Sequence, residues 1–219
     1  MTLHGHRPAT APDDATDVQP RPLSPAPAVD AHPAAQPTPL EPLSPESSPP
    51  PAGAVRPTAR FMRAHPAHWI ALGFGAGLSP VAAGTVGTLW AWLVWHLLIA
   101  DLSLIAQTTV IAVTLPLSWW ASTVTARHLR TADPGAIVID EVIAFWIVLW
   151  LLLPAGFWAQ ASAFALFRFF DAVKPGPVGW ADRLLHDARG WRRGFGIVLD
   201  DLVAAFCTLL VIALWRTWG

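Results

Sequence analysis

Charge and cysteine are scarce in this chain of 219 residues. Only 13% of the residues are charged, against about 25% in a typical soluble domain, and the formal net charge is −1. This composition argues against a water-soluble enzyme, and it gives no electrostatic basis for binding nucleic acid. The single cysteine, Cys207, excludes an internal disulfide framework and the usual structural zinc sites.

Tyrosine is absent, whereas tryptophan is abundant. The chain has 13 Trp and is 53% hydrophobic. Trp favours the membrane–water interface, where both its apolar ring and its N–H group can be satisfied. The composition therefore indicates an integral membrane protein.

Proline divides the chain near residue 60. Residues 1–60 hold 15 of the 22 prolines and none of the tryptophans. A segment of this kind buries too little apolar surface to offset its ordering entropy, so we expect a disordered tail over 1–60 and a membrane-embedded domain over 61–219. The tail contains no apolar run resembling a signal-peptide core. A Pro-rich docking segment is the functional alternative to a plain solvated tail.

Five apolar stretches follow the tail. A helix that crosses a bilayer needs about 20 mostly apolar residues, and the fourth stretch is too short unless it is extended or partly embedded. Another segment, residues 68–81, is apolar but Gly-rich, which suits a re-entrant or interfacial piece. We expect an all-α polytopic membrane helix bundle of about four to five membrane segments. The stretches are residues 85–100, 102–124, 137–153, 157–170 and 197–215.

Basic residues gather in three places: before the first stretch, after the second, and between the fourth and fifth. The short turns around Asp101 and 154–156 carry no Arg or Lys. The positive-inside rule therefore places the tail and both basic loops in the cytoplasm. With five spans the C-terminus, with Arg216, would face outward, which is a mild objection to that count.

On this topology three groups of carboxylates fall at one depth on the cytoplasmic side. Charged residues so near the hydrocarbon are costly and usually mark a functional site. Carboxylates at this density repel one another unless protons or cations neutralise them. Hard oxygen ligands suit Mg²⁺, which also binds phosphate. The groups are Asp140 with Glu141, Asp171, and Asp200 with Asp201.

Two cations accompany these acids. Arg168, Asp171 and Lys174 recur at three-residue spacing and would share one face if a helix continues to Lys174. A cation beside a metal-binding carboxylate is what a phosphate oxygen requires. Upstream, the Gly-rich segment 73–88, with Ser79 and Thr85, could form an anion cradle, although glycines alone are a weak signal.

Four motifs carry a resemblance to a known family. They are GFGAGLSPVAAGTVGT (73–88), DPGAIVIDEVIAFW (133–146), FRFFDAVKPGPV (167–178) and GFGIVLDDLVAA (194–205). In their order and spacing, over residues 66–215, the chain resembles phosphatidylglycerophosphatase A, a family of bacterial integral membrane lipid phosphatases. It departs from the family pattern at Ala83, Ala144 and Ala205, and in its long Pro-rich tail.

The resemblance implies Mg²⁺-dependent hydrolysis of the terminal phosphomonoester of phosphatidylglycerophosphate, which gives phosphatidylglycerol and inorganic phosphate. It implies a multi-pass protein of the bacterial inner membrane that acts on a membrane phospholipid, with the active site facing the cytoplasm. The family's acidic motifs map onto Asp140, Glu141, Asp171, Asp200 and Asp201, and its lysine maps onto Lys174.

One hypothesis is metal-assisted phosphoryl transfer to water. Asp140, Asp171 and Asp200 or Asp201 would bind one or two Mg²⁺, Lys174 and Arg168 would hold phosphate oxygens, and Glu141 would be the general base. Ser79 and Thr85 are further candidates for substrate binding. A covalent aspartyl-phosphate on Asp171 is an alternative that the sequence leaves open.

Each feature also has a structural interpretation. Either acidic pair could stabilise a helix N-terminus, Asp171 could form an ion pair with Arg168 or Lys174, and the glycines could serve close helix packing. At the level of function, intramembrane carboxylates also mark ion-coupled transporters, and a scaffold with a docking tail is a third class. Carriers usually place such carboxylates near the bilayer midplane, however.

Overall fold

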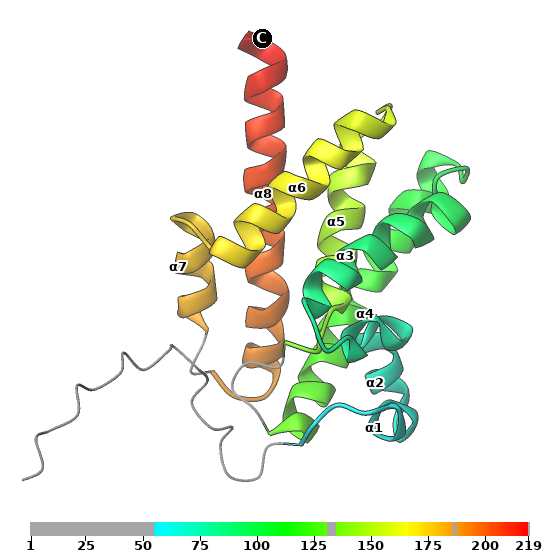
Figure 1. Cartoon of the computed structure of the whole chain (residues 1–219), viewed down its shortest axis with the longest axis vertical. Helices are drawn as coiled ribbons and strands as arrows, with labels where there is room; N and C mark the ends of the chain where they lie inside the picture. Colours follow the sequence, from blue (N-terminus) through cyan, green and yellow to red (C-terminus); the bar gives the residue numbers. More distant parts are fainter. Residues whose placement is uncertain (1–54, 131–134, 186–187, 219) are drawn as a thin grey trace, which may run out of the picture. The chain divides into compact units, whose positions relative to one another are not determined.

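Helices make up every regular element in the part of the chain that the structure describes. The structure is a computed structural model and describes residues 55–130, 135–185 and 188–218. The all-α prediction is confirmed for these residues (Figure 1). Most of the predicted disordered tail, residues 1–54, lies outside them, so the boundary at residue 60 stays a prediction.

Short helices form the N-terminal part of the described chain. Helix α1 (Ala59–Arg63) begins after Thr58, whose hydroxyl accepts a hydrogen bond from the Phe61 N–H at 3.1 Å. Helix α2 (Pro66–Ala71) has proline at its first position, where the missing N–H costs nothing. A 3₁₀ segment, η1 (Gly73–Leu78), follows. The Gly-rich stretch predicted over 68–81 is thus short irregular helix, because positive φ angles at Gly73 and Gly75 interrupt it.

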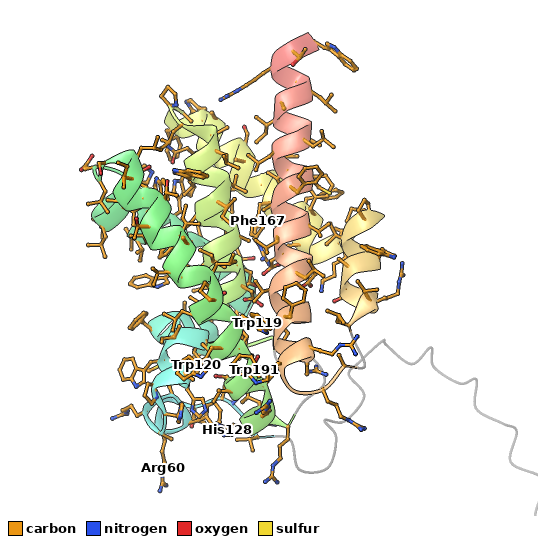
Figure 2. All side chains as sticks on the ribbon, turned by 180° about the vertical axis from the view of Figure 1, so that it is seen from behind. Arg60, Trp119, Trp120, His128, Phe167 and Trp191 are labelled. Carbon is orange, nitrogen blue, oxygen red and sulfur yellow. The ribbon has the colours of Figure 1, made fainter. Side chains whose placement is uncertain are left out.

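A pair of histidines joins α2 to the end of α4 (Leu104–Leu129). Nε2 of His68 lies 2.8 Å from Nδ1 of His128, and Nδ1 of His68 donates to the Phe61 carbonyl at 2.8 Å. Burial and the neighbouring His128 and His65 rings lower the pKa of His68, against the opposing effect of the Phe61 carbonyl. His128 and Arg60 lie at the same end of the molecule (Figure 2).

Helix α3 (Ala83–Val94) runs without a break into a π-helical turn, η2 (Trp95–Ile99), close to the predicted stretch 85–100. The carbonyl groups at the end of a helix need donors. The side-chain amide of Gln107 donates to the carbonyls of Ile99, Ala100 and Leu102 at 3.0–3.3 Å. Gln107 therefore stabilises the turn between η2 and α4.

Among the described residues, two helices are long and apolar enough to cross a membrane, α4 (Leu104–Leu129) and α8 (Trp191–Trp218). The other predicted stretches also form helices, but shorter ones: α5 (Ile139–Leu152), α6 (Phe157–Val173) and the apolar run Ala83–Ile99. The count of four to five membrane segments therefore stays a prediction, and two candidate spans is the finding.

The core forms around α5, which packs against α3, α4, α6 and α8 (Figure 1). An aromatic cluster joins α3, α5 and α6: the Phe145 ring lies 5.7–6.3 Å from those of Trp92, Phe164 and Phe167. Phe167 is fully buried in the bundle (Figure 2). Rings at such separations add attraction to their large buried area, so this cluster fixes α6 against α5.

Helix α8 begins at Trp191, six residues before the predicted start at 197. The Trp119 indole donates to the Trp191 carbonyl at 2.7 Å, and the two rings meet edge to face (Figure 2). Gly194 lies so close to Thr123 that a side chain there would collide with α4. Close packing therefore supports a polar first turn that the apolar pattern did not indicate.

Candidate active site

Asp140 and Glu141 lie in the first turn of α5. The Glu141 N–H donates to Oδ1 of Asp140 at 3.1 Å, and the helix N-terminus favours negative charge. The structural interpretation as a helix-end pair therefore agrees with the geometry. It does not account for a third carboxylate at the same place.

The third carboxylate belongs to Asp201 of α8. One carboxylate oxygen each from Asp140, Glu141 and Asp201 lie within 4.8 Å of one another. Asp140 and Asp201 are buried, and Oε2 of Glu141 is buried without a hydrogen-bond partner among the described residues. Three anionic groups this close require protons or a cation. An all-oxygen donor set with an unpartnered oxygen fits a hard divalent cation such as Mg²⁺.

Asp200 and Asp201 occupy the interior of α8, so the interpretation of this pair as a helix N-terminal cap is wrong. Adjacent residues on a helix point about 100° apart. Asp201 accordingly joins Asp140 and Glu141, whereas Asp200 pairs with Lys174. The sequence left open which of the two would serve a metal, and the geometry brings Asp201 to the cluster.

Arg168 of α6 lies at the edge of the carboxylate cluster. Its Nη1 pairs with Oδ2 of Asp171 and lies 3.6 Å from Oε1 of Glu141. The predicted Arg168–Asp171 ion pair is therefore present. Asp171 is not one of the three clustered carboxylates, although it interacts electrostatically with Asp140 and Asp201. Nε of Arg168 is buried without a hydrogen-bond partner among the described residues.

Lys174 does not share the helical face of Arg168 and Asp171, because α6 ends at Val173. Lys174 follows in the left-handed conformation (φ 49°), and its Nζ lies 2.5 Å from Asp182 and 2.6 Å from Asp200. Burial opposes its charge, but the hydrogen bonds to the two carboxylates outweigh burial and raise the pKa of Lys174 above its usual 10.5. Asp182 lies outside the four motifs, and no sequence signal singled it out.

The Gly-rich segment meets the cluster at Gly84. A Cβ at this position would clash with Oε1 of Glu141 and lie 2.9 Å from Nη2 of Arg168. Ser79 donates to the carbonyl of Val81 at 2.8 Å, which is the structural role considered for it. Thr85 lies in the first turn of α3. Substrate binding by Ser79 or Thr85 stays a prediction.

Helix α8, one of the two described helices long and apolar enough to cross a membrane, contributes Asp201 to the buried carboxylate cluster, and Arg168 lies at the edge of that cluster. These features define an all-α protein with a candidate metal-binding site. The family model described as phosphatidylglycerophosphatase A matches residues 69–216. The chain belongs to this family, and it is therefore an enzyme, a phosphatase.

Curated relatives agree with this assignment. The chain is 37% identical to phosphatidylglycerophosphatase A of Escherichia coli strain K12, over 67% of this chain and 81% of the relative. It is 33% identical to phosphatidylglycerophosphatase A of Haemophilus influenzae, over 74% and 96%. A relative in Bacteroides thetaiotaomicron, 36% identical over 67% and 91%, has a name that refers to phosphatidylinositol-3-phosphatase. No solved structure matches the chain.

Proposed function

We propose that the protein hydrolyses the terminal phosphomonoester of phosphatidylglycerophosphate and releases phosphatidylglycerol and inorganic phosphate. The observation that carries this proposal is the buried cluster of Asp140, Glu141 and Asp201 in a chain whose named relatives include two phosphatidylglycerophosphatases. Family membership favours an enzyme over the transporter considered from the sequence.

Mg²⁺ is the proposed cofactor, and Asp140, Glu141 and Asp201 would hold it. Their clustered oxygens meet the preference of this ion for hard oxygen ligands. When bound, the ion supplies positive charge against the phosphate oxygens of the substrate. Asp171 and Asp200 are already paired with Arg168 and Lys174, so they fit a supporting role better.

Arg168 and Lys174 would hold the non-bridging oxygens of the phosphate. A guanidinium has five N–H donors and an ammonium three, so each cation has donors beyond those in its present pairs. The further donors of Arg168 would favour the added negative charge that develops as phosphorus is attacked. Arg168 at the edge of the clustered acids would also reduce the repulsion that a dianionic phosphate would meet there.

Water is the proposed nucleophile. Its oxygen forms a bond to phosphorus while the bond from phosphorus to the glycerol oxygen breaks, and the leaving oxygen takes up a proton. Oε2 of Glu141 would accept the proton of the attacking water, since it is not committed to another partner among the described residues. Asp171 is a less suitable covalent nucleophile, because Arg168 already binds its carboxylate.

The bacterial inner membrane is the proposed location, with a multi-pass topology and the site facing the cytoplasm. The two apolar helices and the distribution of Arg and Lys support this placement. Cysteine labelling of loop residues from either side of the membrane tests the orientation.

Phosphate release from purified protein in detergent tests the activity. Phosphatidylglycerophosphate, phosphatidic acid and phosphatidylinositol 3-phosphate should be compared, each with Mg²⁺ and with chelator. We expect phosphatidylglycerophosphate to give the highest kcat/KM and the chelator to abolish release. Preference for another lipid phosphomonoester would overturn the substrate, and undiminished release with chelator would overturn the metal.

A further inference from the structure

Lys174 is held between two helices by two carboxylates. Its ammonium lies 2.5 Å from Oδ1 of Asp182 in α7 (Pro177–Leu184) and 2.6 Å from Oδ2 of Asp200 in α8. Helix α7 packs beside α8, and α6 leads into it (Figure 1). The Asp182–Lys174–Asp200 bridge therefore joins α7 to the helix that carries Asp201.

The backbone around Lys174 is arranged to place this side chain. Lys174 occupies the left-handed conformation that usually follows a helix as glycine, at some cost for a residue with a Cβ. Gly176 also has positive φ, and Pro177 starts α7, so the chain turns from α6 into α7 within three residues. Gly179 packs against the Lys174 carbonyl, where a Cβ would lie 2.5 Å from the oxygen. This turn brings Asp182 to Lys174.

We propose that Asp182 is a positioning residue of the phosphatase site. It holds the Lys174 ammonium beside Asp200, so that two N–H groups are engaged by carboxylates and the third is directed to a phosphate oxygen of the substrate. Asp182 itself acts only through Lys174. This inference rests on the proposed function.

Lys174 needs two partners because the lysine side chain is flexible. Four rotatable carbons separate the ammonium from the backbone, and a single partner leaves the ammonium free to pivot about that contact. Two carboxylates from different helices fix its position, which lowers the entropy that substrate binding would otherwise cost. A contact made equally in the bound substrate and in the transition state appears in KM and not in kcat.

Kinetics of Asp182→Asn in the full-length protein, with saturating Mg²⁺ and phosphatidylglycerophosphate in mixed micelles, test the proposal. We expect KM to rise about fivefold to tenfold while kcat changes less than about twofold. Asp182→Glu should restore most of the affinity because it keeps the charge. Asp101→Asn is the matched control, since Asp101 is exposed in the turn between η2 and α4, and its KM should stay at the wild-type value.

A double-mutant cycle separates positioning from a plain structural role. In a Lys174→Gln background, Asp182→Asn should leave KM and kcat unchanged, because the residue through which it acts is gone. A further loss in that background would overturn the proposal, as would an unchanged KM in the single variant. If the wild-type protein releases no phosphate from phosphatidylglycerophosphate, the proposed function fails and the role of Asp182 falls with it.

Discussion

The guanidinium of Arg168 in α6 lies 3.6 Å from the carboxylate of Glu141 in α5 and also pairs with Asp171, one turn further along α6. Nη1 makes both contacts, and the guanidinium keeps further N–H groups on its other nitrogens that a lysine ammonium would lack. Arg168→Lys should therefore lower kcat/KM by about tenfold to a hundredfold while the thermal unfolding midpoint changes little. A wild-type value of kcat/KM in this variant would show that the Arg168 guanidinium has no role in the reaction.

Asp200 and Asp201 are neighbours in sequence with different partners, so they should respond differently to the same substitution. Asp201→Asn removes a charge from the three-carboxylate cluster and should raise the Mg²⁺ concentration for half-maximal activity by about tenfold or more. Asp200→Asn loosens Lys174 and should change mainly KM. Magnesium titrations of both variants check this. Equal shifts in Mg²⁺ requirement would contradict the division of roles.

Gly84 lies close to Glu141 and Arg168 because it has no side chain. Gly84→Ala would push a methyl group against Oε1 of Glu141 and Nη2 of Arg168, so we expect kcat to fall by about tenfold or more. Gly156→Ala is the control, because its Cβ would meet nothing within 4 Å. If both variants kept full activity, the close approach of α3 to these two residues would have no catalytic consequence.

Gln160 should matter for stability rather than for catalysis. Its Oε1 accepts from the Trp92 indole and from Nε2 of His96, both at 2.7 Å, and its amide donates to the Ala155 carbonyl. Gln160→Leu leaves these groups without their partner and should reduce the free energy of unfolding by about 1–3 kcal/mol. Thermal or denaturant unfolding in detergent measures the loss, and kcat below the transition should match the wild type.

His68 predicts a pH dependence of stability. Its pKa is below 6.5 in the folded protein, whereas in the unfolded chain it returns to that value, so the unfolded state binds more protons between the two. The contribution of His68 to the free energy of unfolding is complete above pH 6.5, and it declines as the pH falls toward the folded pKa. His68→Gln should flatten this part of the stability curve measured by denaturant unfolding. An unchanged slope would show that other groups cause it.

The apolar pattern located the helices better than it located their ends. All five predicted stretches are helical, because a run of apolar residues must satisfy its backbone internally wherever it is buried. The start of α8 was missed because Trp191, Arg192 and Arg193 resemble a loop by composition. Packing of Gly194 on Thr123, a contact distant in sequence, extends the helix through them.

The sequence also indicated the acids and cations of the site, but not how they pair. Helical spacing placed Lys174 with Arg168 and Asp171, whereas the left-handed backbone at Lys174 turns it toward Asp182 and Asp200. Lysine rarely adopts this conformation, so spacing alone could not reveal it. No sequence pattern singled out Asp182, because the turn between α6 and α7 is what brings it to Lys174.

The length of α8 can be compared with the thickness of a bilayer to locate Asp200 and Asp201 relative to the lipid. Its 28 residues extend roughly 42 Å, about 12 Å more than a hydrocarbon core of about 30 Å. If α8 stands upright with Trp215 and Trp218 at one interface, the excess emerges at the opposite end, around Trp191. Asp200 and Asp201 follow Trp191 by roughly 14 Å, which places them at the boundary between acyl chains and headgroups. A lipid would present its phosphate at that level while both of its tails remain in the leaflet, so the proposed dephosphorylation would need no extraction of the lipid.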